Sequence, residues 1–364
     1  MLKEFTIEEI NKGNLDKEGL MDTAVSFAET VREDILQKWH REETVLADKK
    51  LNEYVLIEGI IQILGINVRV FYHLLELDER FSDAMRIEHL TDLESFKDFD
   101  RKRKNLKVRL KNVSKRNLKK RGRETYVLDN VVLEVDLNKY RKGKEIKKDN
   151  YDSEFIHSTT KGTVAGFRLS MLVNITNCSL KKTNIYPIDT PKKDIWEEMV
   201  IDELGTYNGN IKVVIADGGF FAYENYRKSV HNRIIPVINP RSDCRENLKE
   251  MLKNLPPKLE WFEENNKETT DQLVKEYKEI LNQAVEKSLN YDKYKETRSK
   301  IELVFKIAKE IFGMNDLHVY HEEGALWKAF PALYLSSLFY QFLKMNEVNE
   351  HRAIELIAQK RDAW

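Results

Sequence analysis

Ile211-Lys-Val-Val-Ile-Ala-Asp-Gly-Gly-Phe220 is the stretch of sequence that decides the fold. Its apolar, β-branched run ends at Asp217, which predicts a buried central strand with a carboxylate at its C-terminal end. Gly218 and Gly219 allow a tight turn and leave that carboxylate uncovered. Because open α/β sheets bind ligands outside the carboxyl ends of their strands, Asp217 is a candidate site residue. The alternative is that Asp217 only caps the turn or the next helix.

The surrounding sequence predicts a mixed sheet with helices packed on it. A short strand over Thr125–Asp129 also ends in an acid, and two further extended pieces follow at Val131–Leu137 and Lys161–Ile175. Extended pieces without helices between them form an antiparallel meander. After it, helices and strands alternate: a helix at Asp194–Leu204, the central strand, a helix at Tyr223–Val230 and a strand at Arg233–Ile238. This order is typical of an α/β fold.

The chain of 364 residues is long enough for more than one domain. We expect a helical DNA-binding region, a basic linker, the first part of a catalytic core, a helical insertion and the last part of the core with C-terminal helices, over residues 1–100, 101–124, 125–239, 240–292 and 293–364. In the first region, Tyr54–Leu64 and Val68–Leu77 are predicted helices joined by Gly65-Ile66-Asn67, a helix-turn-helix pattern. Arg69, Tyr72 and His73 would lie on the second helix, where they could meet DNA. An ordinary pair of antiparallel helices is the alternative.

One segment of the chain is strongly basic. Residues 101–123 contain 13 Lys or Arg and no acid, so the rest of the chain has a net charge of −13 although the whole is neutral. A solvated helix normally carries acids between its basic residues. Binding to a phosphate backbone is therefore the better interpretation, with candidate contacts at Arg101, Lys102, Arg103, Lys104, Lys119, Lys120 and Arg121.

Composition excludes several other classes of protein. A hydrophobic content of 41% supports a sizeable core, and 34% charge is high without being typical of disorder. Cys178 and Cys244 have no partner pattern, which favours a reducing compartment and argues against structural zinc. The N-terminus lacks an apolar signal core. The longest apolar region, Ala325–Leu343, contains Lys328 and Pro331 and is predicted to be a core helix rather than a membrane span.

The helix predicted over residues 294–312 carries a polar stripe. At about 100° per residue, one face presents Tyr294, Arg298, Glu302, Phe305 and Lys309. Leu303, Val304, Ile307 and Ile311 lie on the opposite half and are expected to pack inward. The simplest interpretation is an Arg298–Glu302 surface pair worth about 0.2–0.5 kcal/mol.

Taken together, Asp129, Asp217 and Glu302 suggest a metal site. Carboxylates that arrive from separate elements at one sheet edge repel each other unless a cation neutralises them. Oxygen ligands without His or Cys suit Mg²⁺, with Mn²⁺ as a substitute. Two such ions about 3.5–4 Å apart can activate a water or a 3′-hydroxyl and stabilise the leaving oxygen of a phosphodiester. Both the acids and the basic segment point to DNA as the substrate.

Four motifs resemble the DDE transposases of bacterial and archaeal insertion sequences, specifically the class with a Tyr-Arg-Glu-Lys signature. They are VLDNVVLEVDLN (127–138), KGTVAGFRL (161–169), VVIADGGFFAYENY (213–226) and YKETRSKIELVFKIAK (294–309). The resemblance covers about residues 120–345. The spacings of Arg298, Glu302 and Lys309 fit the signature, whereas Tyr294 lies one residue further from Arg298 than in that class. Asn130-Val131 departs from the usual residues after the first acid, so Asp136 remains an alternative there. Gly219-Phe220 is a smaller departure after the second acid.

The resemblance implies a ribonuclease-H-like core with Asp129, Asp217 and Glu302 as catalytic, metal-binding acids. It also implies that Tyr294, Arg298 and Lys309 contact the element end. The expected activity is cleavage at terminal inverted repeats and transfer of the 3′-hydroxyl into target DNA, by a homodimer on double-stranded DNA in a prokaryotic, nucleoid-associated cytoplasmic setting. A catalytically silent DNA-binding relative and a metal-dependent nuclease without strand transfer are the alternatives.

Overall fold

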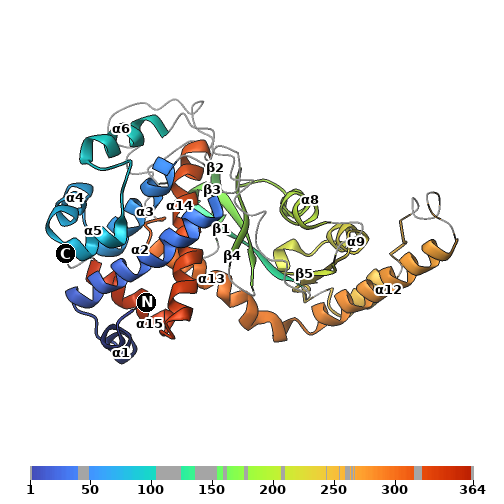
Figure 1. Cartoon of the computed structure of the whole chain (residues 1–364). Coiled ribbons are helices and arrows are strands. Elements are labelled where there is room, and N and C mark those ends of the chain that lie inside the picture. The colour runs from blue at the N-terminus through green and yellow to red at the C-terminus, as the bar shows by residue number, and fades with distance from the viewer. Residues whose placement is uncertain are drawn as a thin grey trace. The chain divides into compact units, whose positions relative to one another are not determined.

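A computed structural model describes residues 2–39, 49–103, 124–135, 154–158, 162–175, 179–205, 210–242, 244–253, 255–258, 263, 265, 267–314 and 322–361. Contacts divide the chain into two units (Figure 1). The helical unit comprises Met1–Arg116, Leu133–Asp152 and Leu303–Trp364, and the sheet unit comprises Asn117–Val132 and Ser153–Glu302. Asp136, the alternative first acid, lies outside the described residues.

Among the described residues, the sheet unit contains six strands. They are β1 (Thr125–Glu134), β2 (Glu154–Ser158), β3 (Gly162–Asn174), β4 (Ser179–Tyr186), β5 (Lys212–Ala216) and β6 (Ile234–Ile238). The order is β2-β3-β1-β5-β6, and β4 also pairs with β3. The pairs of β3 with β2 and with β4 are antiparallel, whereas those of β5 with β1 and with β6 are parallel. This mixed sheet confirms the predicted ribonuclease-H-like fold class.

Strand β1 differs from the prediction of two extended pieces, because it runs unbroken from Thr125 to Glu134. Asp129 therefore lies within a strand rather than at its end. The reason is in the pairing, since β5 accompanies β1 only from Thr125 to Leu128 while β1 itself continues. Asp129 stands where the neighbouring strand stops.

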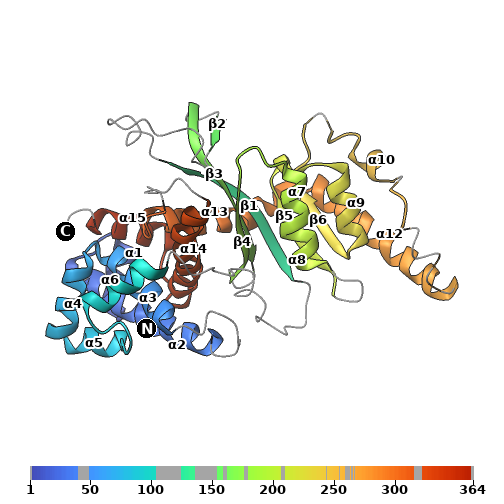
Figure 2. The ribbon, with the colours of Figure 1, turned by 90° about the horizontal axis from the view of Figure 1, so that it is seen from above.

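Helices pack against this sheet. They are α7 (Lys192–Trp196), which continues through the π-helical turn η4 (Glu197–Ile201) into α8 (Asp202–Leu204), then α9 (Tyr223–His231), α10 (Leu248–Lys253) and α12 (Lys267–Leu289). The η4 turn contacts β3 and β4, and α9 and α12 lie along β6 (Figure 2). Within the predicted insertion, α12 thus packs on the sheet. Its Ser288 hydroxyl, which accepts from the Ile238 N–H at 3.3 Å, helps fix it there.

The helical unit joins N-terminal and C-terminal helices. They are α1 (Glu4–Lys12), α2 (Lys17–Trp39), α3 (Lys49–Leu64), α4 (Val68–Leu77), α5 (Glu79–Met85), α6 (Leu93–Arg103), α14 (Glu322–Met345) and α15 (Glu350–Arg361). Its core is aromatic: the Phe27 ring lies 5.0 Å from that of Phe339 and 5.5 Å from that of Phe342. The apolar region near the C-terminus is therefore a core helix, as its sequence indicates. Among the described residues, no single helix is long and apolar enough to cross a membrane; α3 and α4 satisfy length and composition only as a pair bent by 95°.

The same bend gives α3 and α4 the geometry of a helix-turn-helix, for which axes at about 90–120° are usual. Asn67 caps α4 by accepting from the N–H groups of Arg69 and Val70. Arg69 and His73 are exposed, but Tyr72 is buried and its hydroxyl donates to the Leu90 carbonyl at 2.6 Å. Tyr72 is thus a core residue rather than a surface contact.

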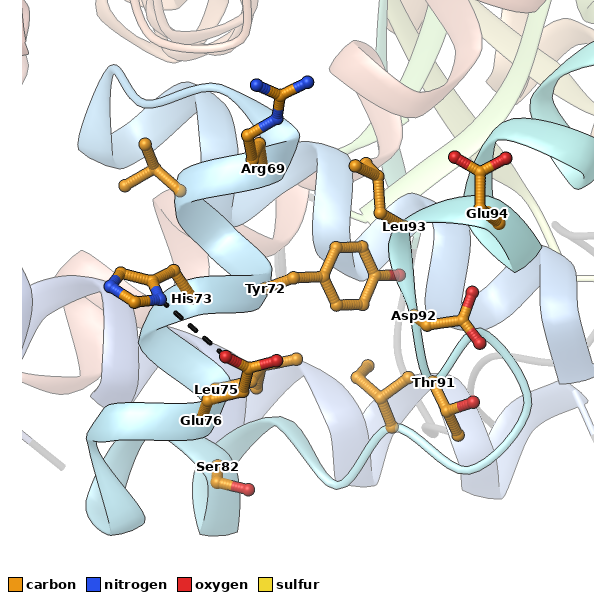
Figure 3. Close-up of a pocket in the computed structure, with 12 residues that line it drawn as sticks. Arg69, Tyr72, His73, Leu75, Glu76, Ser82, Thr91, Asp92, Leu93 and Glu94 are labelled. Atoms are coloured by element: carbon orange, nitrogen blue, oxygen red, sulfur yellow. Dashed lines mark ion pairs between the residues drawn. The ribbon is translucent and has the colours of Figure 1, made fainter.

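A groove of about 830 Å³ runs beside α4 (Figure 3). Arg69 and His73 lie on one side of it, and the acids of its lining are Glu76, Asp92 and Glu94. His73 Nδ1 lies 3.7 Å from Glu76 Oε2. This predominance of acids is unfavourable to a phosphate backbone, so the groove itself is a poor DNA-binding surface.

Candidate active site

The β1–β5 pair brings two of the three candidate acids to one place. Leu128 is paired with Ala216 in a parallel register, so the next residue of β1 is Asp129 and the residue directly after the end of β5 is Asp217. Neighbouring strands are about 4.8 Å apart. The sequence predicted this meeting from the ends of the strands, and the register supplies its structural basis.

Asp129 is a buried carboxylate, with 9% of the residue exposed. Burial raises its pKa to about 6, and the negative charges of Asp217 and Glu302 also act to raise it. The Arg298 charge and a hydrogen bond from the Asn130 N–H act in the opposite direction. That N–H donates to Asp129 Oδ1 at 2.8 Å. The influence of both other acids on this pKa shows that the three charges share one electrostatic environment.

Arg298 links Asp129 to Glu302. It lies on α13 (Lys295–Glu310), and its Nη1 donates to Asp129 Oδ2 at 2.9 Å while its Nη2 donates to Glu302 Oε1. The Glu302 side chain is 50% exposed, whereas that of Arg298 is 26% exposed. The predicted Arg298–Glu302 pair therefore exists, but the same guanidinium also reaches the buried acid on β1.

Asp217 is held by its own turn and by a second cation. Its Oδ1 accepts from the Gly219 N–H at 3.0 Å and caps the short 3₁₀ helix η5 (Gly218–Phe220). Lys192, the first residue of α7, places its Nζ at 3.4 Å from each carboxylate oxygen. Asp217 thus does cap the turn, as the simpler interpretation of the sequence held, and it lies beside Asp129 as well.

Comparison with known proteins identifies the family of the chain. Residues 120–327, more than half of the chain, match the family model of the transposase DDE domain. The chain belongs to the DDE transposase family. Among solved structures, it is similar to a cryo-EM structure of a piggyBac transposase synaptic complex with hairpin DNA, at 11% identity and a TM-score of 0.42, over 86% of this chain and 70% of that one. No curated protein matches the chain.

Members of the DDE transposase family use divalent metal ions, and the three carboxylates are oxygen donors of the kind that Mg²⁺ prefers. As they stand, no three His, Cys, Asp or Glu side chains in the described ranges are arranged to hold such an ion. Arg298 contacts Asp129 and Glu302, and Lys192 contacts Asp217. The three carboxylates are suitable ligands for Mg²⁺ by their chemistry. In this structure each of them is paired with Arg298 or Lys192.

Tyr294 does not lie on α13 as the sequence predicted. It ends the 3₁₀ turn η6 (Tyr291–Tyr294), which precedes that helix, so its direction cannot be read from a 100° wheel. Its hydroxyl accepts from Lys287 Nζ at 3.0 Å. The tyrosine in the electrostatic environment of all three acids is Tyr291, which sequence analysis missed. Tyr291 lies at the other end of the same turn. In the sequence, its aromatic ring is the one feature that could have marked it as a candidate.

Tyr291 is buried, with 4% of the residue exposed. Burial raises its pKa to about 12; the Arg298 charge lowers it, and the charges of Asp217, Asp129 and Glu302 raise it. Its hydroxyl has no hydrogen-bond partner among the described residues. A buried, unsatisfied donor costs free energy, so this hydroxyl is a natural candidate for a contact made when substrate is bound.

The remaining predicted site residues are more dispersed. Lys309 is half-buried on α13 and belongs by its contacts to the helical unit. Phe305 was expected on the polar stripe but is buried, together with Leu303 and Val304, because this end of the helix is part of that unit's core. Arg101 lies exposed near the end of α6, with its Nη2 at 3.7 Å from Asp98 Oδ1. The side chains of Lys102, Arg103, Lys104, Lys119, Lys120 and Arg121 lie outside the described residues.

Proposed function

We propose that this chain is an active DNA transposase whose catalytic acids are Asp129, Asp217 and Glu302. The observation that carries the proposal is the joining of the three acids through adjacent strands and one guanidinium. Ordinary surface ion pairs do not require three acids from separate elements to lie together, because each pair contributes to stability independently. Asp129 and Asp217 come from the sheet and Glu302 from a helix, so the fold itself sets their separation.

The three acids would hold Mg²⁺, or Mn²⁺ in its place, with two ions per site. When bound, such ions activate a water or a 3′-hydroxyl and stabilise the leaving oxygen of a phosphodiester. The chain's part is to fix the carboxylates. Asp129 is held inside β1, and Asp217 is oriented by the Gly219 N–H. Glu302 has the most exposed side chain of the three acids.

The proposed substrate is double-stranded DNA at the inverted repeats of the element, followed by target DNA. Arg298, Lys309 and Tyr294 would contact the element end, and the basic segment from Arg101 to Arg121 would bind phosphates. We expect two copies of the chain on the paired ends, acting in a prokaryotic cytoplasm. Arg298 suits a phosphate because its guanidinium can form two parallel hydrogen bonds.

Incubation of the purified full chain with Mg²⁺ and a labelled duplex carrying the element end tests the proposal. Joined products indicate a transposase, cut products alone indicate a nuclease, and bound but intact DNA indicates a silent relative. Asp129→Asn, Asp217→Asn and Glu302→Gln should each abolish cleavage while leaving end binding largely intact. Normal cleavage by any one of them would remove that residue from the catalytic set.

A matched acid on the same helix provides the control. Glu310 is half-exposed at the end of α13, where its Oε2 lies 3.9 Å from Lys306 Nζ. Glu310→Gln changes the charge as Glu302→Gln does, and it should cut DNA normally. If neither Glu302→Gln nor Glu310→Gln cuts DNA, then loss of any acidic charge from α13 abolishes cleavage, and the result does not identify Glu302 as a catalytic acid.

The basic segment has a separate test. Neutralising Arg101, Lys102, Arg103 and Lys104 together should weaken binding to all DNA sequences alike. The slope of log K against log salt should fall by about 0.9 for each phosphate that the variant no longer neutralises. An unchanged slope would show that these side chains remain solvated in the complex.

A further inference from the structure

Lys192 occupies an unusual position beside Asp217. Its ammonium nitrogen is equidistant from the two carboxylate oxygens, at 3.4 Å from each, and lies 4.9 Å from the centroid of the Phe220 ring. It enters from α7, an element that none of the four family motifs includes. Its side chain is 31% exposed and that of Asp217 is 38% exposed, so solvent reaches the pair from outside.

Gly219 makes this approach possible. A Cβ at this position would lie 1.9 Å from Lys192 Nζ and 2.9 Å from its Cε, so the lysine would have to move away. The lysine therefore crosses directly over a residue without a side chain. The second glycine after Asp217 thus has a role beyond backbone freedom, because it leaves the space through which the ammonium reaches the carboxylate.

Lys192 and Arg298 together offset most of the negative charge of the acid site. Arg298 binds Asp129 and Glu302, and Lys192 binds Asp217, so each of the three carboxylates has a cation of this chain as its partner. The two cations differ in how easily they can leave. Arg298 lies between two acids, one of them buried, whereas Lys192 has one half-exposed acid and a flexible four-carbon stem.

We propose that Lys192 is a positioning residue that exchanges partners. It holds Asp217 while no divalent ion is bound, and it moves onto a phosphate of the DNA backbone once Asp217 has become a metal ligand. This inference rests on the proposed function of the acid site. An ammonium suits both roles, since it is a compact charge that binds carboxylate or phosphate without demanding a planar, two-point geometry.

Metal affinity without DNA provides the first test, by calorimetric titration of the full chain with Mn²⁺. Lys192→Gln removes a competing cation and should tighten Mn²⁺ binding by about two- to fivefold, the range expected when an exposed ion pair is removed. Lys193→Gln is the matched control, because Lys193 is the exposed neighbour on the same helix. Equal affinities for the Lys192 and Lys193 variants would overturn the proposal.

The second test measures the salt dependence of DNA binding with and without a divalent ion. In Ca²⁺, Lys192→Gln should lower the slope of log K against log salt by about 0.9, the value for one phosphate. In EDTA, its slope should equal that of the wild type, because the ammonium then stays on Asp217. A slope that is unchanged in Ca²⁺, or lowered equally in both conditions, contradicts the exchange.

Asp217→Asn separates this inference from the proposed function. If Asp217→Asn binds Mn²⁺ as tightly as the wild type, the proposed metal site itself is wrong. If Asp217→Asn fails to bind Mn²⁺ while Lys192→Gln behaves as Lys193→Gln does in both tests, the metal site stands and only the exchange is wrong.

Discussion

Asp129 on β1 and Asp217 after β5 are neighbours in register, yet their surroundings differ. The Asp129 side chain is 12% exposed and is bound by the guanidinium that also holds Glu302. The Asp217 side chain is 38% exposed, caps its own turn and is bound by an ammonium on a flexible stem. A buried charge is strongly destabilised when its partner is removed, whereas an exposed one is readily compensated by water. We therefore expect Asp129 to keep its partner and fix the geometry of the site, and Asp217 to be able to change its partner.

The largest expected effect comes from removing the partner of the buried acid. Arg298→Ala removes the cation that offsets the buried Asp129 carboxylate, which must then either stay charged without a partner or take up a proton, and this should cost about 4 kcal/mol of unfolding free energy. Urea unfolding at pH 8 in EDTA measures this change. Arg227→Ala is the control, because its pair with Glu224 is 41% and 39% exposed and is worth less than about 1 kcal/mol. Similar destabilisation of the two variants would show that Asp129 is no more dependent on its partner than a surface acid.

The next effect is the pH dependence of the buried acid. The pKa of Asp129 is about 6 in the folded chain against an ordinary value of 3.8, so ionisation opposes folding. This cost is absent below pH 3.8, grows as the pH rises and is complete above about 6. In EDTA at pH 8, Asp129→Asn should be more stable than the wild type by on the order of 2–3 kcal/mol. The difference should shrink as the pH falls toward about 4, and a difference independent of pH would contradict the assignment.

Asp217 should respond much more weakly. Asp217→Ala removes the cap of η5 and should cost about 1 kcal/mol. Asp217→Asn keeps an oxygen that can accept from the Gly219 N–H, so its unfolding free energy should stay within about 0.5 kcal/mol of the wild type. Thermal unfolding of the two variants in EDTA measures the contrast. A large destabilisation by Asp217→Asn would mean that folding depends on the charge of Asp217 as strongly as on that of Asp129.

The sequence predicted the central strands of the sheet and the meeting of Asp129 with Asp217 because both follow from local patterns, whereas β2 lies in a segment expected to be a loop. The apolar run before Asp217 forms β5, and its parallel pairing with β1 brings Asp129 alongside. Strand β4 escaped prediction because its sequence, Ser179-Leu-Lys-Lys-Thr-Asn-Ile-Tyr186, is largely polar. Lys182 is nevertheless buried, and its Nζ donates to the Glu198 carbonyl at 2.7 Å. Such a long-range contact has no local signature.

The contacts around the acids were less predictable for the same reason. Arg298 was correctly paired with Glu302, since residues four apart on a helix are neighbours. Its contact with Asp129 joins residues 169 positions apart, and that of Lys192 with Asp217 joins residues 25 apart. Tyr294 was misplaced because η6 turns more tightly than an α-helix. Side chains that meet across elements depend on packing, which periodicity alone does not encode.

The smallest expected effect on stability concerns the Tyr291 hydroxyl, which lies in the electrostatic environment of Asp129 and Asp217. Tyr291→Phe removes a buried donor that has no partner among the described residues, so it should leave the unfolding free energy within about 0.5 kcal/mol of the wild type. Tyr226→Phe is the matched control. The Tyr226 hydroxyl lies 2.9 Å from Ser288 Oγ and 3.3 Å from the Ile238 carbonyl, and its removal should cost about 1–2 kcal/mol.

End cleavage measured on the same Tyr291→Phe sample decides what the hydroxyl does. The Tyr291 hydroxyl is buried in the environment of Asp129, Asp217, Glu302 and Arg298 and has no partner among the described residues, which costs free energy. A hydrogen bond made by this hydroxyl when DNA is bound would account for that cost. We therefore expect cleavage to fall by about tenfold or more, the effect of removing one hydrogen bond to a charged group, while stability is unchanged. Full cleavage by a fully stable variant would leave the hydroxyl without a function. A clear fall in stability would instead mean that it has a partner in the folded chain, and Tyr291 would then belong to the core of the sheet unit rather than to the acid site.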